Sequence, residues 1–533
     1  MKNNILKYIF FIFIIAIAIF AIYKINESNA SKEKENKSQE AIQEEEQVEQ
    51  KLNLGIAEFD MLNPIISKNK YVQNISKLIY EPLITINSNY ELECKLASEW
   101  AKTSDTTYLI KLKENVTWSN GEKFTVEDVL YTIDKLKEMN SESIYVYNVQ
   151  YIVQAEILDT YTIKITLSQE VPFFEYNLNF PIMSKSYYGE ASFKDSEKTR
   201  NPMGTGMYTI SQIQDTQITL KKNEEYWNKK SENPTIETIA INLYSSIGEM
   251  YNDFKLGKID LVNTTNINIE EYIGTIGYNK VEDIGREHDY LVLNTENKVL
   301  TNPEVRQSIM YAIDKNAIIQ SIFNGKYTEA DFPLPNTNWL YQGSKTSVYN
   351  AERAKQILQE HGWEFKYNYW QKYVNYYTRK LNFNLVVNSS NQNRTKVAEL
   401  IKQQLEAIGI KVTIKYATDT QYQNYKTYKN YDMILCGTYV GTNPDLTIYF
   451  GENNLANYNN EEAKTIINEV KNITDTETLK QKYKRLYELY ITDIPYISLY
   501  HSYDVVAYSK DLAGSLSANW FNMFYNISSW SKK

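Results

Sequence analysis

The stretch 381–436 alternates strand and helix patterns, and it constrains the fold more than any other feature of this chain. Apolar residues alternate along 381–387 and again along 410–416, as they do in half-buried strands. Between them a helical pattern covers about 394–408 and ends at Gly409, the residue type favoured just after a helix. A strand–helix–strand unit requires a parallel sheet with a right-handed crossover. The chain is therefore predicted to be an α/β protein.

A third apolar segment, 431–436, leads into a loop that runs from Gly437 to Asp445 and contains Gly and Pro. In open α/β sheets, ligands bind beyond the carboxyl ends of the strands. The loop is therefore a candidate ligand site, and an ordinary turn is the alternative that the local pattern leaves open. The candidate residues in it are Thr438, Tyr439, Val440, Gly441 and Asp445.

A helix start is also readable at Thr125. This residue has the side chain of a helix N-cap, and Asp128 stands three residues later, as in a capping box. The carboxylates of Glu127 and Asp128 would then lie at the positive end of the helix dipole. That position explains them better than catalysis does.

Length and composition set limits on the class of protein. A chain of 533 residues is too long for one compact core, so two or more domains are expected. Its net charge of -9 argues against a nucleic-acid partner, which would need a clustered basic face. The cysteines, Cys94 and Cys436, cannot form a disulfide framework, and the 3 histidines form no metal motif. No metal or other cofactor is predicted.

Tyrosine is unusually frequent, with 46 residues. One explanation is a compositional bias that also raises the content of Asn, Lys and Ile. The other is that tyrosine rings line a ligand-binding site. Both explanations remain open.

The N-terminus predicts export. Lys2 and Lys7 precede an apolar run, 8–23, which is long for a signal peptide and slightly short for a full membrane span. We expect residues 1–30 to be an uncleaved membrane anchor with the N-terminus inside; cleavage after Ala30 is the alternative. Residues 31–51 are rich in Lys, Glu and Gln and are expected to form a solvated polar stalk or a short charged helix.

Motifs of catalysis are missing from the sequence. It contains no GxSxG elbow and no GxxxxGK[ST] phosphate loop. The segment 201–208 contains Gly204 and Gly206, but a strand-like run follows where a phosphate loop needs a helix. The chain is therefore predicted not to be an enzyme, and a cell-envelope hydrolase remains only a formal alternative.

Short segments in a fixed order carry a resemblance to a known family. They are Leu96–Trp100, Trp118–Val129, Asn201–Tyr208, Val305–Lys315 and Ile494–Tyr500. Together they resemble the bacterial extracellular solute-binding proteins of family 5, the oligopeptide- and dipeptide-binding components of ABC importers, over nearly everything after Lys51.

The resemblance implies a two-lobed periplasmic-binding-protein-like fold of class II, with an extra subdomain inserted in lobe I. Two crossing strands would join the lobes, with a hinge near Asn294 and Asp493. The implied boundaries are lobe I at 52–90, 204–294 and 494–533, the inserted subdomain at 91–203, and lobe II at 295–493.

The resemblance also implies a binding mode that this sequence only partly matches. Peptide-binding members carry a Gly-Trp-x-Ala-Asp-Tyr loop whose aspartate holds the peptide amine, but Thr438 and Gly441 stand at the tryptophan and aspartate positions. Either Asp445 supplies the charge, or the ligand has no free amine. Other positions that face the cleft in relatives are His288, Asp289, Tyr290, Tyr145 and Tyr147.

The implied function is capture of a solute between two closing lobes, without covalent chemistry. An oligopeptide is the expected ligand, and an oligosaccharide or signalling molecule is the alternative. The expected partners are ABC permease subunits and, through the N-terminal segment, the cell membrane; the protein is expected to be a monomer at the extracellular face. With no cysteine before Cys94, it is not expected to be a lipoprotein.

Overall fold

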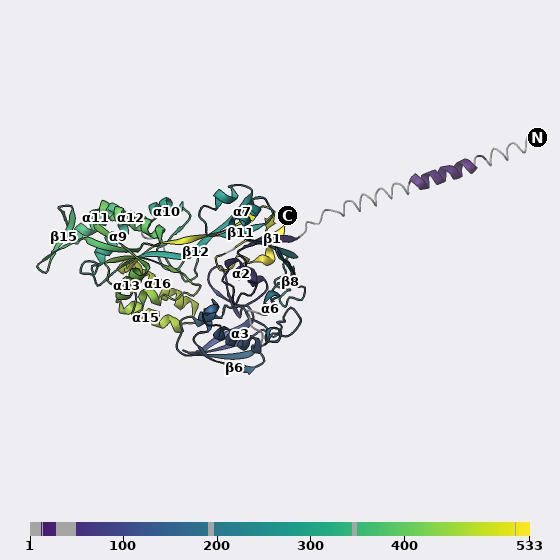
Figure 1. Ribbon diagram of the computed structural model, residues 1–533, viewed down its shortest axis with the longest axis horizontal. Coiled ribbons are helices and arrows are strands. Elements are labelled where there is room, and N and C mark those ends of the chain that lie inside the picture. Colours follow the sequence, from purple (N-terminus) through teal and green to yellow (C-terminus); the bar gives the residue numbers. More distant parts are fainter. Residues whose placement is uncertain (1–11, 13, 28–49, 190–196, 344–348, 518) are drawn as a thin grey trace, which may run out of the picture. The chain divides into compact units, whose positions relative to one another are not determined.

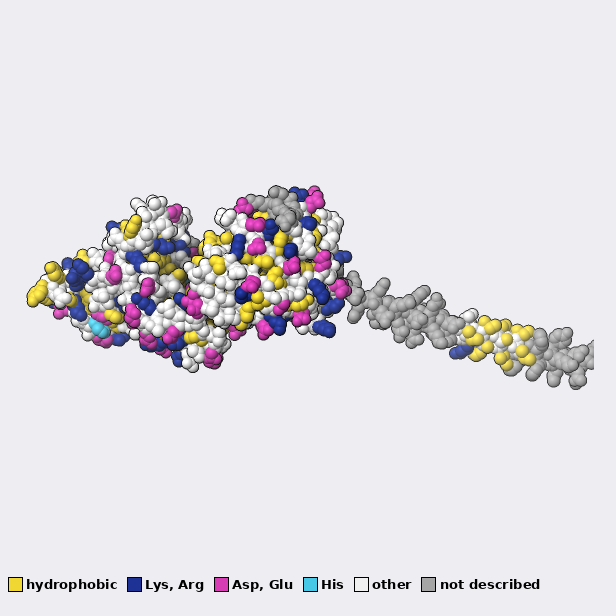
Figure 2. Space-filling view, turned by 90° about the horizontal axis from the view of Figure 1, so that it is seen from below, with side chains coloured by type: hydrophobic (Ala, Val, Ile, Leu, Met, Phe, Trp, Pro, Cys, Tyr) yellow, Lys and Arg dark blue, Asp and Glu magenta, His cyan; other side chains and the backbone are white. Residues whose placement is uncertain are grey.

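The computed structural model describes residues 12, 14–27, 50–189, 197–343, 349–517 and 519–533 (Figure 1). They fall into two units, residues 1–50 with 532–533, and residues 51–531. In the first unit, residues 14–27 are helical, and Figure 2 shows hydrophobic side chains covering this helix. No helix among the described residues is long and apolar enough to cross a membrane. Most of the predicted anchor and stalk, residues 1–11, 13 and 28–49, lies outside the described residues.

The second unit begins with a four-stranded sheet in the order β1-β10-β9-β8. Strand β1 (Lys51–Ala57) pairs in parallel with β10 (Thr238–Tyr244), so segments about 190 residues apart meet side by side. Strands β9 (Gln217–Lys222) and β8 (Tyr208–Ile213) continue the sheet. The alternating apolar residues predicted for β1, such as Leu52 and Leu54, are buried in its core.

A second four-stranded sheet, here called the small sheet, has the order β4-β5-β7-β6. Its strands are β4 (Ala97–Ser104), β5 (Thr107–Leu112), β7 (Thr162–Leu167) and β6 (Ile152–Asp159). Helix α3 (Val126–Glu138) begins at Thr125 with the predicted capping box, in which Asp128 accepts from the Thr125 backbone. The prediction of a helix start there is confirmed.

The large sheet has seven strands, with the main order β11-β20-β12-β19-β17-β18 and β13 paired to β20. Strand β17 (Asn382–Asn388) runs parallel to both β18 (Lys411–Ala417) and β19 (Met433–Tyr439). Helix α12 (Gln392–Ala407) connects β17 to β18. The predicted strand–helix–strand unit is therefore confirmed.

Two long strands, β12 (Tyr278–Leu293) and β20 (Tyr496–Ser509), run through the large sheet as an antiparallel pair. One half of the pair joins β11 (Leu261–Thr264), and the other half joins β19. Between Ile284 and His288 the register shifts. Gly285 lies in this break, where a Cβ atom would come within 2.5 Å of the Ser502 hydroxyl. The two strands are thus close but irregular at this point.

The remaining helices and strands pack around these sheets or form short hairpins. They are α2 (Lys70–Ile75), η1 (Ser76–Leu78), β2 (Ile84–Ile86), β3 (Leu92–Cys94), η2 (Asn140–Glu142), α4 (Val146–Val149), η3 (Phe174–Leu178), α5 (Lys185–Tyr188), α6 (Glu197–Arg200), α7 (Ile247–Lys255), α8 (Ile269–Ile273), α9 (Pro303–Ala312), α10 (Lys315–Phe323), β13 (Thr328–Glu329), α11 (Ala351–Glu360), β14 (Glu364–Lys366), β15 (Tyr369–Val374), β16 (Tyr377–Lys380), α13 (Asp419–Tyr428), α14 (Thr447–Phe450), α15 (Glu461–Glu469), η4 (Val470–Asn472), α16 (Thr476–Asp493), β21 (Leu512–Ala513), η5 (Ile527–Ser529) and β22 (Ser531–Lys532).

Candidate ligand-binding site

The register of β12 and β19 brings two predicted site segments together. His288 lies opposite Thr438, and Asp289 lies opposite Gly437. This is the carboxyl end of β19, and β17 runs parallel to β19, so the chain leaves both strands at the same edge of the sheet. Arg394 follows β17 in the first turn of α12 and reaches the same edge.

At that edge lies an ion cluster formed by Glu287, Asp289 and Arg394, here called the acid–arginine cluster. Arg394 donates from Nε to Asp289 Oδ2 at 3.0 Å and from Nη2 to Asp289 Oδ1 at 2.8 Å. Its Nη2 also donates to Glu287 Oε1 at 2.5 Å. The Tyr500 hydroxyl donates to Asp289 Oδ2 at 2.9 Å. Asp289 thus forms a bidentate ion pair with Arg394 and accepts a hydrogen bond from the Tyr500 hydroxyl.

The acid–arginine cluster carries two carboxylates and one guanidinium, so its three side chains have a net charge of -1. The Asp289 side chain is 5% exposed, while that of Glu287 is 32% exposed and reaches solvent. Burial raises the pKa of Glu287, the neighbouring Asp289 raises it further, and Arg394 opposes both. A further cation beside Glu287 would stabilise the ionised form of its carboxylate.

The glycine at 437 is explained by this cluster. A Cβ atom at Gly437 would lie 1.8 Å from Arg394 Nη2 and 2.1 Å from Asp289 Oδ1. Both contacts are far below van der Waals distance, so any side chain at this position would displace the ion pair.

The start of the loop carries an exposed aromatic group. The Tyr439 ring is 70% exposed. The Arg286 guanidinium lies 5.4 Å from the centre of the Tyr439 ring and 5.4 Å from that of Trp520. Trp520 donates from Nε1 to the Tyr90 hydroxyl at 3.0 Å. The backbone of Val440 donates to the Arg286 carbonyl at 2.8 Å. Aromatic and cationic surface therefore adjoins the acid–arginine cluster.

The end of the loop is tied to its own helix. Asp445 Oδ1 accepts from the Thr447 backbone at 2.9 Å and from the Thr447 hydroxyl at 2.5 Å, at the start of the short helix α14. Asn443 donates to the Pro172 carbonyl at 3.2 Å, which joins the loop to the segment after β7. Gly441 is exposed between these points. The predicted amine contact of Asp445 stays a prediction.

Two of the predicted residues, His288 and Tyr290, lie in the core. His288 is 0% exposed and is hydrogen-bonded to the Tyr449 hydroxyl at 3.2 Å and to the Ser498 hydroxyl at 3.1 Å. Its ring stacks on those of Tyr290 and His501. Burial lowers the pKa of His288 well below its usual value, with His501 adding to the shift. These rings fill space beneath the site.

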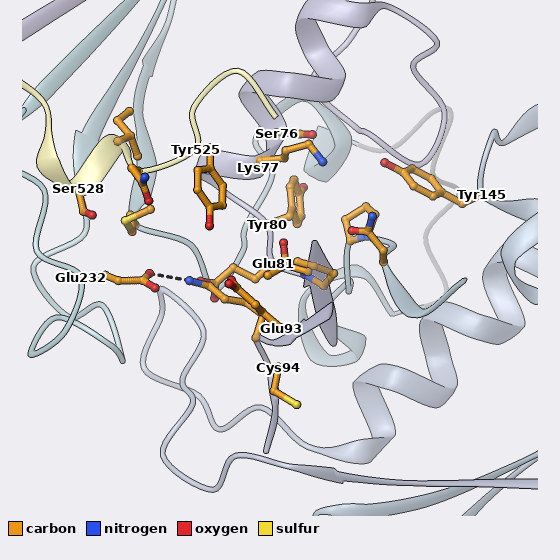
Figure 3. Close-up of a pocket in the computed structure, with 18 residues that line it drawn as sticks. Ser76, Lys77, Tyr80, Glu81, Glu93, Cys94, Tyr145, Glu232, Tyr525 and Ser528 are labelled. Carbon is orange, nitrogen blue, oxygen red and sulfur yellow. Dashed lines mark hydrogen bonds and ion pairs between the residues drawn. The ribbon is translucent and has the colours of Figure 1, made fainter. Parts of the chain in front are cut away.

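Tyr145 and Tyr147 lie elsewhere, at the start of α4 and within it. Tyr147 is 71% exposed. Tyr145 donates its hydroxyl to Gln73 at 2.7 Å and lines a cavity of about 260 Å³ (Figure 3). No residue of the acid–arginine cluster or of the loop 437–445 lines this cavity. The structure therefore separates these two tyrosines from the other predicted site residues.

Four residues near this edge were not predicted as site residues from the sequence: Arg286, Glu287, Arg394 and Trp520. Arg286 and Glu287 directly precede the predicted strand residue His288, and Arg394 stands at the start of a predicted helix that follows a strand. Those positions at the carboxyl edge of a sheet were a usable signal. Trp520 has no such signal, because only tertiary packing brings it to the site.

Comparison with known proteins identifies the family. Residues 91–460 match the middle region of the bacterial extracellular solute-binding proteins, family 5. The chain belongs to this family. The predicted recognition and the predicted class of function, solute binding, are thus confirmed.

Two curated relatives span most of the chain. Heme-binding protein A of Haemophilus influenzae is 25% identical over 497 residues, covering 85% of this chain and 87% of the relative. Oligopeptide-binding protein AppA of Bacillus subtilis is 23% identical over 502 residues, covering 89% and 90%. Both are solute-binding proteins by name.

Solved structures of similar fold cover the same region. The periplasmic murein tripeptide-binding protein MppA, in its unliganded open form, has a TM-score of 0.78 at 16% identity and covers 91% of this chain and 98% of its own. HbpA2 of Haemophilus parasuis has a TM-score of 0.76 at 23% identity and covers 91% and 100%. The predicted two-lobed fold class is confirmed.

Proposed function

We propose that this chain is the extracellular substrate-binding protein of an ABC importer, that it captures an oligopeptide between two closing lobes, and that it delivers the peptide to the permease. Family membership supports solute capture, and the peptide-binding relatives favour a peptide. The Haemophilus relative is named for heme, so a non-peptide solute is the second candidate. The observation that carries the peptide proposal is the net charge of the acid–arginine cluster.

A peptide brings an ammonium group that must be paired once water is excluded, because an unpaired buried ion costs several kcal/mol. Glu287 is half-buried, has a raised pKa and lies beside the loop where relatives hold the amine. We therefore place the amine on Glu287, with Asp445 as the rival position from the sequence. The exposed Tyr439 ring would pack against the peptide.

We propose the lobe boundaries that the family resemblance implies. They are lobe I at 52–90, 204–294 and 494–533, the inserted subdomain at 91–203, and lobe II at 295–493. For the hinge, the register break between Ile284 and His288 is a better candidate than Asn294 and Asp493. Asn294 donates to the Tyr431 carbonyl at 2.9 Å, and the Asp493 carbonyl accepts from Arg306 at 2.7 Å. Both are thus bound to residues assigned to lobe II.

The protein is further proposed to act as a monomer and to keep residues 1–30 as a membrane anchor, since lysines flank the apolar run. Intact-mass analysis of protein extracted from membranes tests the anchor. A mature N-terminus at Ser31 would contradict it and leave a secreted protein.

The peptide proposal is tested with a random pentapeptide library and the same library acetylated at its N-termini. Native protein should retain the free-amine library, and Glu287→Gln should lower the affinity of the retained peptides about tenfold, since it removes a charge-assisted hydrogen bond. Asp445→Asn is compared beside it, and Glu452→Gln, at an exposed position, is the matched control.

A loss confined to Asp445→Asn would move the amine to that residue and keep the peptide function. Equal retention of both libraries by the native protein, or no retention at all, would contradict the peptide proposal and favour a solute without an amine.

A further inference from the structure

A cavity of about 260 Å³ lies apart from the acid–arginine cluster, among segments distant in sequence (Figure 3). Its lining includes Ser76 and Lys77 of η1, Tyr80, Tyr145 and, from the C-terminal segment, Tyr525. The volume far exceeds the roughly 30 Å³ that one water molecule takes in the liquid. It is slightly below the range of about 300–1,000 Å³ typical of drug-sized ligands. The space suits a small molecule.

Lys77 gives this cavity its chemistry. Within the described ranges, its ammonium has no hydrogen bond and no ion pair. Burial alone lowers the pKa of Lys77 from its usual 10.5 to about 8. In Figure 3 the amine of Lys77 and the hydroxyl of Tyr145 point toward one another. Lys77 is partly buried, and a desolvated cation without a counter-charge is costly, so an anion in the cavity would reduce that cost.

The other charges inside the cavity are already paired. Lys95 lies 2.6 Å from Glu232 and 3.4 Å from Glu81. Glu81 also accepts from the Tyr226 hydroxyl at 2.7 Å and from Trp227 Nε1 at 2.8 Å. These groups form a closed network that needs no ligand. Glu93 is exposed and accepts from Asn87.

We propose that the cavity is a second binding site, which takes a small organic monocarboxylate whose carboxylate pairs with Lys77. Lys77 is the charged group of the lining that has no bonded partner among the described residues, and one ammonium pairs with one carboxylate. The carboxylates of Glu81, Glu93 and Glu232 on the lining disfavour a dianion such as phosphate. The rings of Tyr80, Tyr145 and Tyr525 offer apolar faces to the organic part and hydroxyls to its polar edge.

The test uses phenylacetate and its neutral isostere phenylacetamide, measured at pH 7 by calorimetry and by saturation-transfer NMR on the full chain. Native protein should bind phenylacetate and discriminate against the amide by about tenfold, the worth of one charge-assisted hydrogen bond. Lys77→Met keeps the length of the side chain and should lose that preference. Lys68→Met, at an exposed position nearby in sequence, should keep it.

Lys77→Arg provides a second check, since it keeps the charge and should retain phenylacetate binding that Lys77→Met loses. Absence of phenylacetate binding to native protein, equal binding of the amide, or unchanged binding in Lys77→Met would each overturn the proposal. Because the peptide site is probed by Glu287→Gln, the two proposals fail independently.

Discussion

The acid–arginine cluster and the Lys77 cavity both hold partly buried charge, but their charged groups are paired differently. In the cluster, two carboxylates share one guanidinium, so one negative charge remains. In the cavity, Glu81 and Glu232 are bonded to Lys95 and to hydroxyl or indole donors and the exposed Glu93 to the Asn87 amide, while Lys77 has no partner among the described residues. Which charged group lacks a bonded partner, and not the number of charged groups, therefore indicates which ligand a site can accept.

The two regions also differ in how tightly they are built. Asp289 accepts from three donor groups of Arg394 and Tyr500, and Gly437 leaves the space they need. Among the residues that the structure describes, Lys77 has packing contacts around its side chain but no hydrogen bond or ion pair. The cluster should therefore contribute to folding even without ligand, whereas Lys77 should oppose folding until an anion binds.

The largest effect is expected for Arg394→Met, which breaks the cluster. It leaves Asp289, a residue 3% exposed, without its counter-charge. Removing one partner of a buried ion pair costs about 3–5 kcal/mol, so the free energy of unfolding in urea at pH 7 should fall by that amount. Glu287→Gln is the control, because it keeps the Arg394–Asp289 pair and should cost less than about 1 kcal/mol. Equal losses in the two variants would show that the pair is not what stabilises this edge.

The stacked histidines His288 and His501 differ from both charged regions, because they are ionisable side chains buried in their uncharged form. His501 stacks on His288 with ring centres 4.8 Å apart, and burial lowers the pKa of His501 from its usual 6.5 to about 4. Between these values the unfolded chain binds a proton that the native state does not. Stability should therefore fall as the pH drops from 6.5 to 4, by about 1–3 kcal/mol for this residue.

His501→Phe should make the loss of unfolding free energy between pH 7 and pH 4 shallower by that amount. His288, whose pKa is also lowered, keeps part of the slope. A variant with the native slope would mean that His501 does not titrate as its burial implies.

Local patterns in the sequence predicted much of the framework. The alternation along 381–387 and 410–416, the helix between them and the cap at Thr125 all depend on neighbours in sequence, and the structure contains each of them. The loop after β19 was also placed at the correct strand end. The lobes of the fold came from the family resemblance and not from these patterns.

The ion cluster could not be predicted in the same way. Arg394 and Asp289 are 105 residues apart, and their contact depends on the register between β12 and β19. The cavity depends on a C-terminal segment packing against η1 and the residues before α4. Charge balance at either place becomes visible only when partners from distant segments are known. The burial of His288, which stays a predicted cleft residue, likewise depends on packing against distant segments.

Lys77→Met tests whether the ammonium of Lys77 in the cavity destabilises the folded protein. A lysine with a lowered pKa destabilises the native state fully below about pH 8, and this cost shrinks as the pH rises toward the unfolded value of 10.5. The variant should therefore be more stable than native protein at pH 7, by about 1–3 kcal/mol, and the gain should decline between pH 8 and pH 10. Urea unfolding at pH 7, 8.5 and 10 measures it. A destabilised variant at pH 7 would mean that the ammonium has a native partner.

The smallest effect is expected at Lys102, which joins the small sheet to the region of the large sheet. Its ammonium donates to the Lys471 carbonyl at 3.2 Å and to Glu170 at 3.3 Å, and it also bonds to Asn472. Lys102→Met should weaken peptide binding at the acid–arginine cluster by about two- to fivefold, since such contacts are worth up to about 1 kcal/mol. Phenylacetate binding should stay unchanged, because no residue of η4 lines the Lys77 cavity.

Lys111→Met, at an exposed position on the neighbouring strand β5, is the matched control and should change neither affinity. Peptide capture needs the two sides of the cleft to meet, so a contact between them adds to peptide affinity. The cavity lies within one side and gains nothing from that contact. If Lys102→Met weakened both ligands equally, the cavity would depend on closure as well, and the two sites would have to be treated as one coupled system.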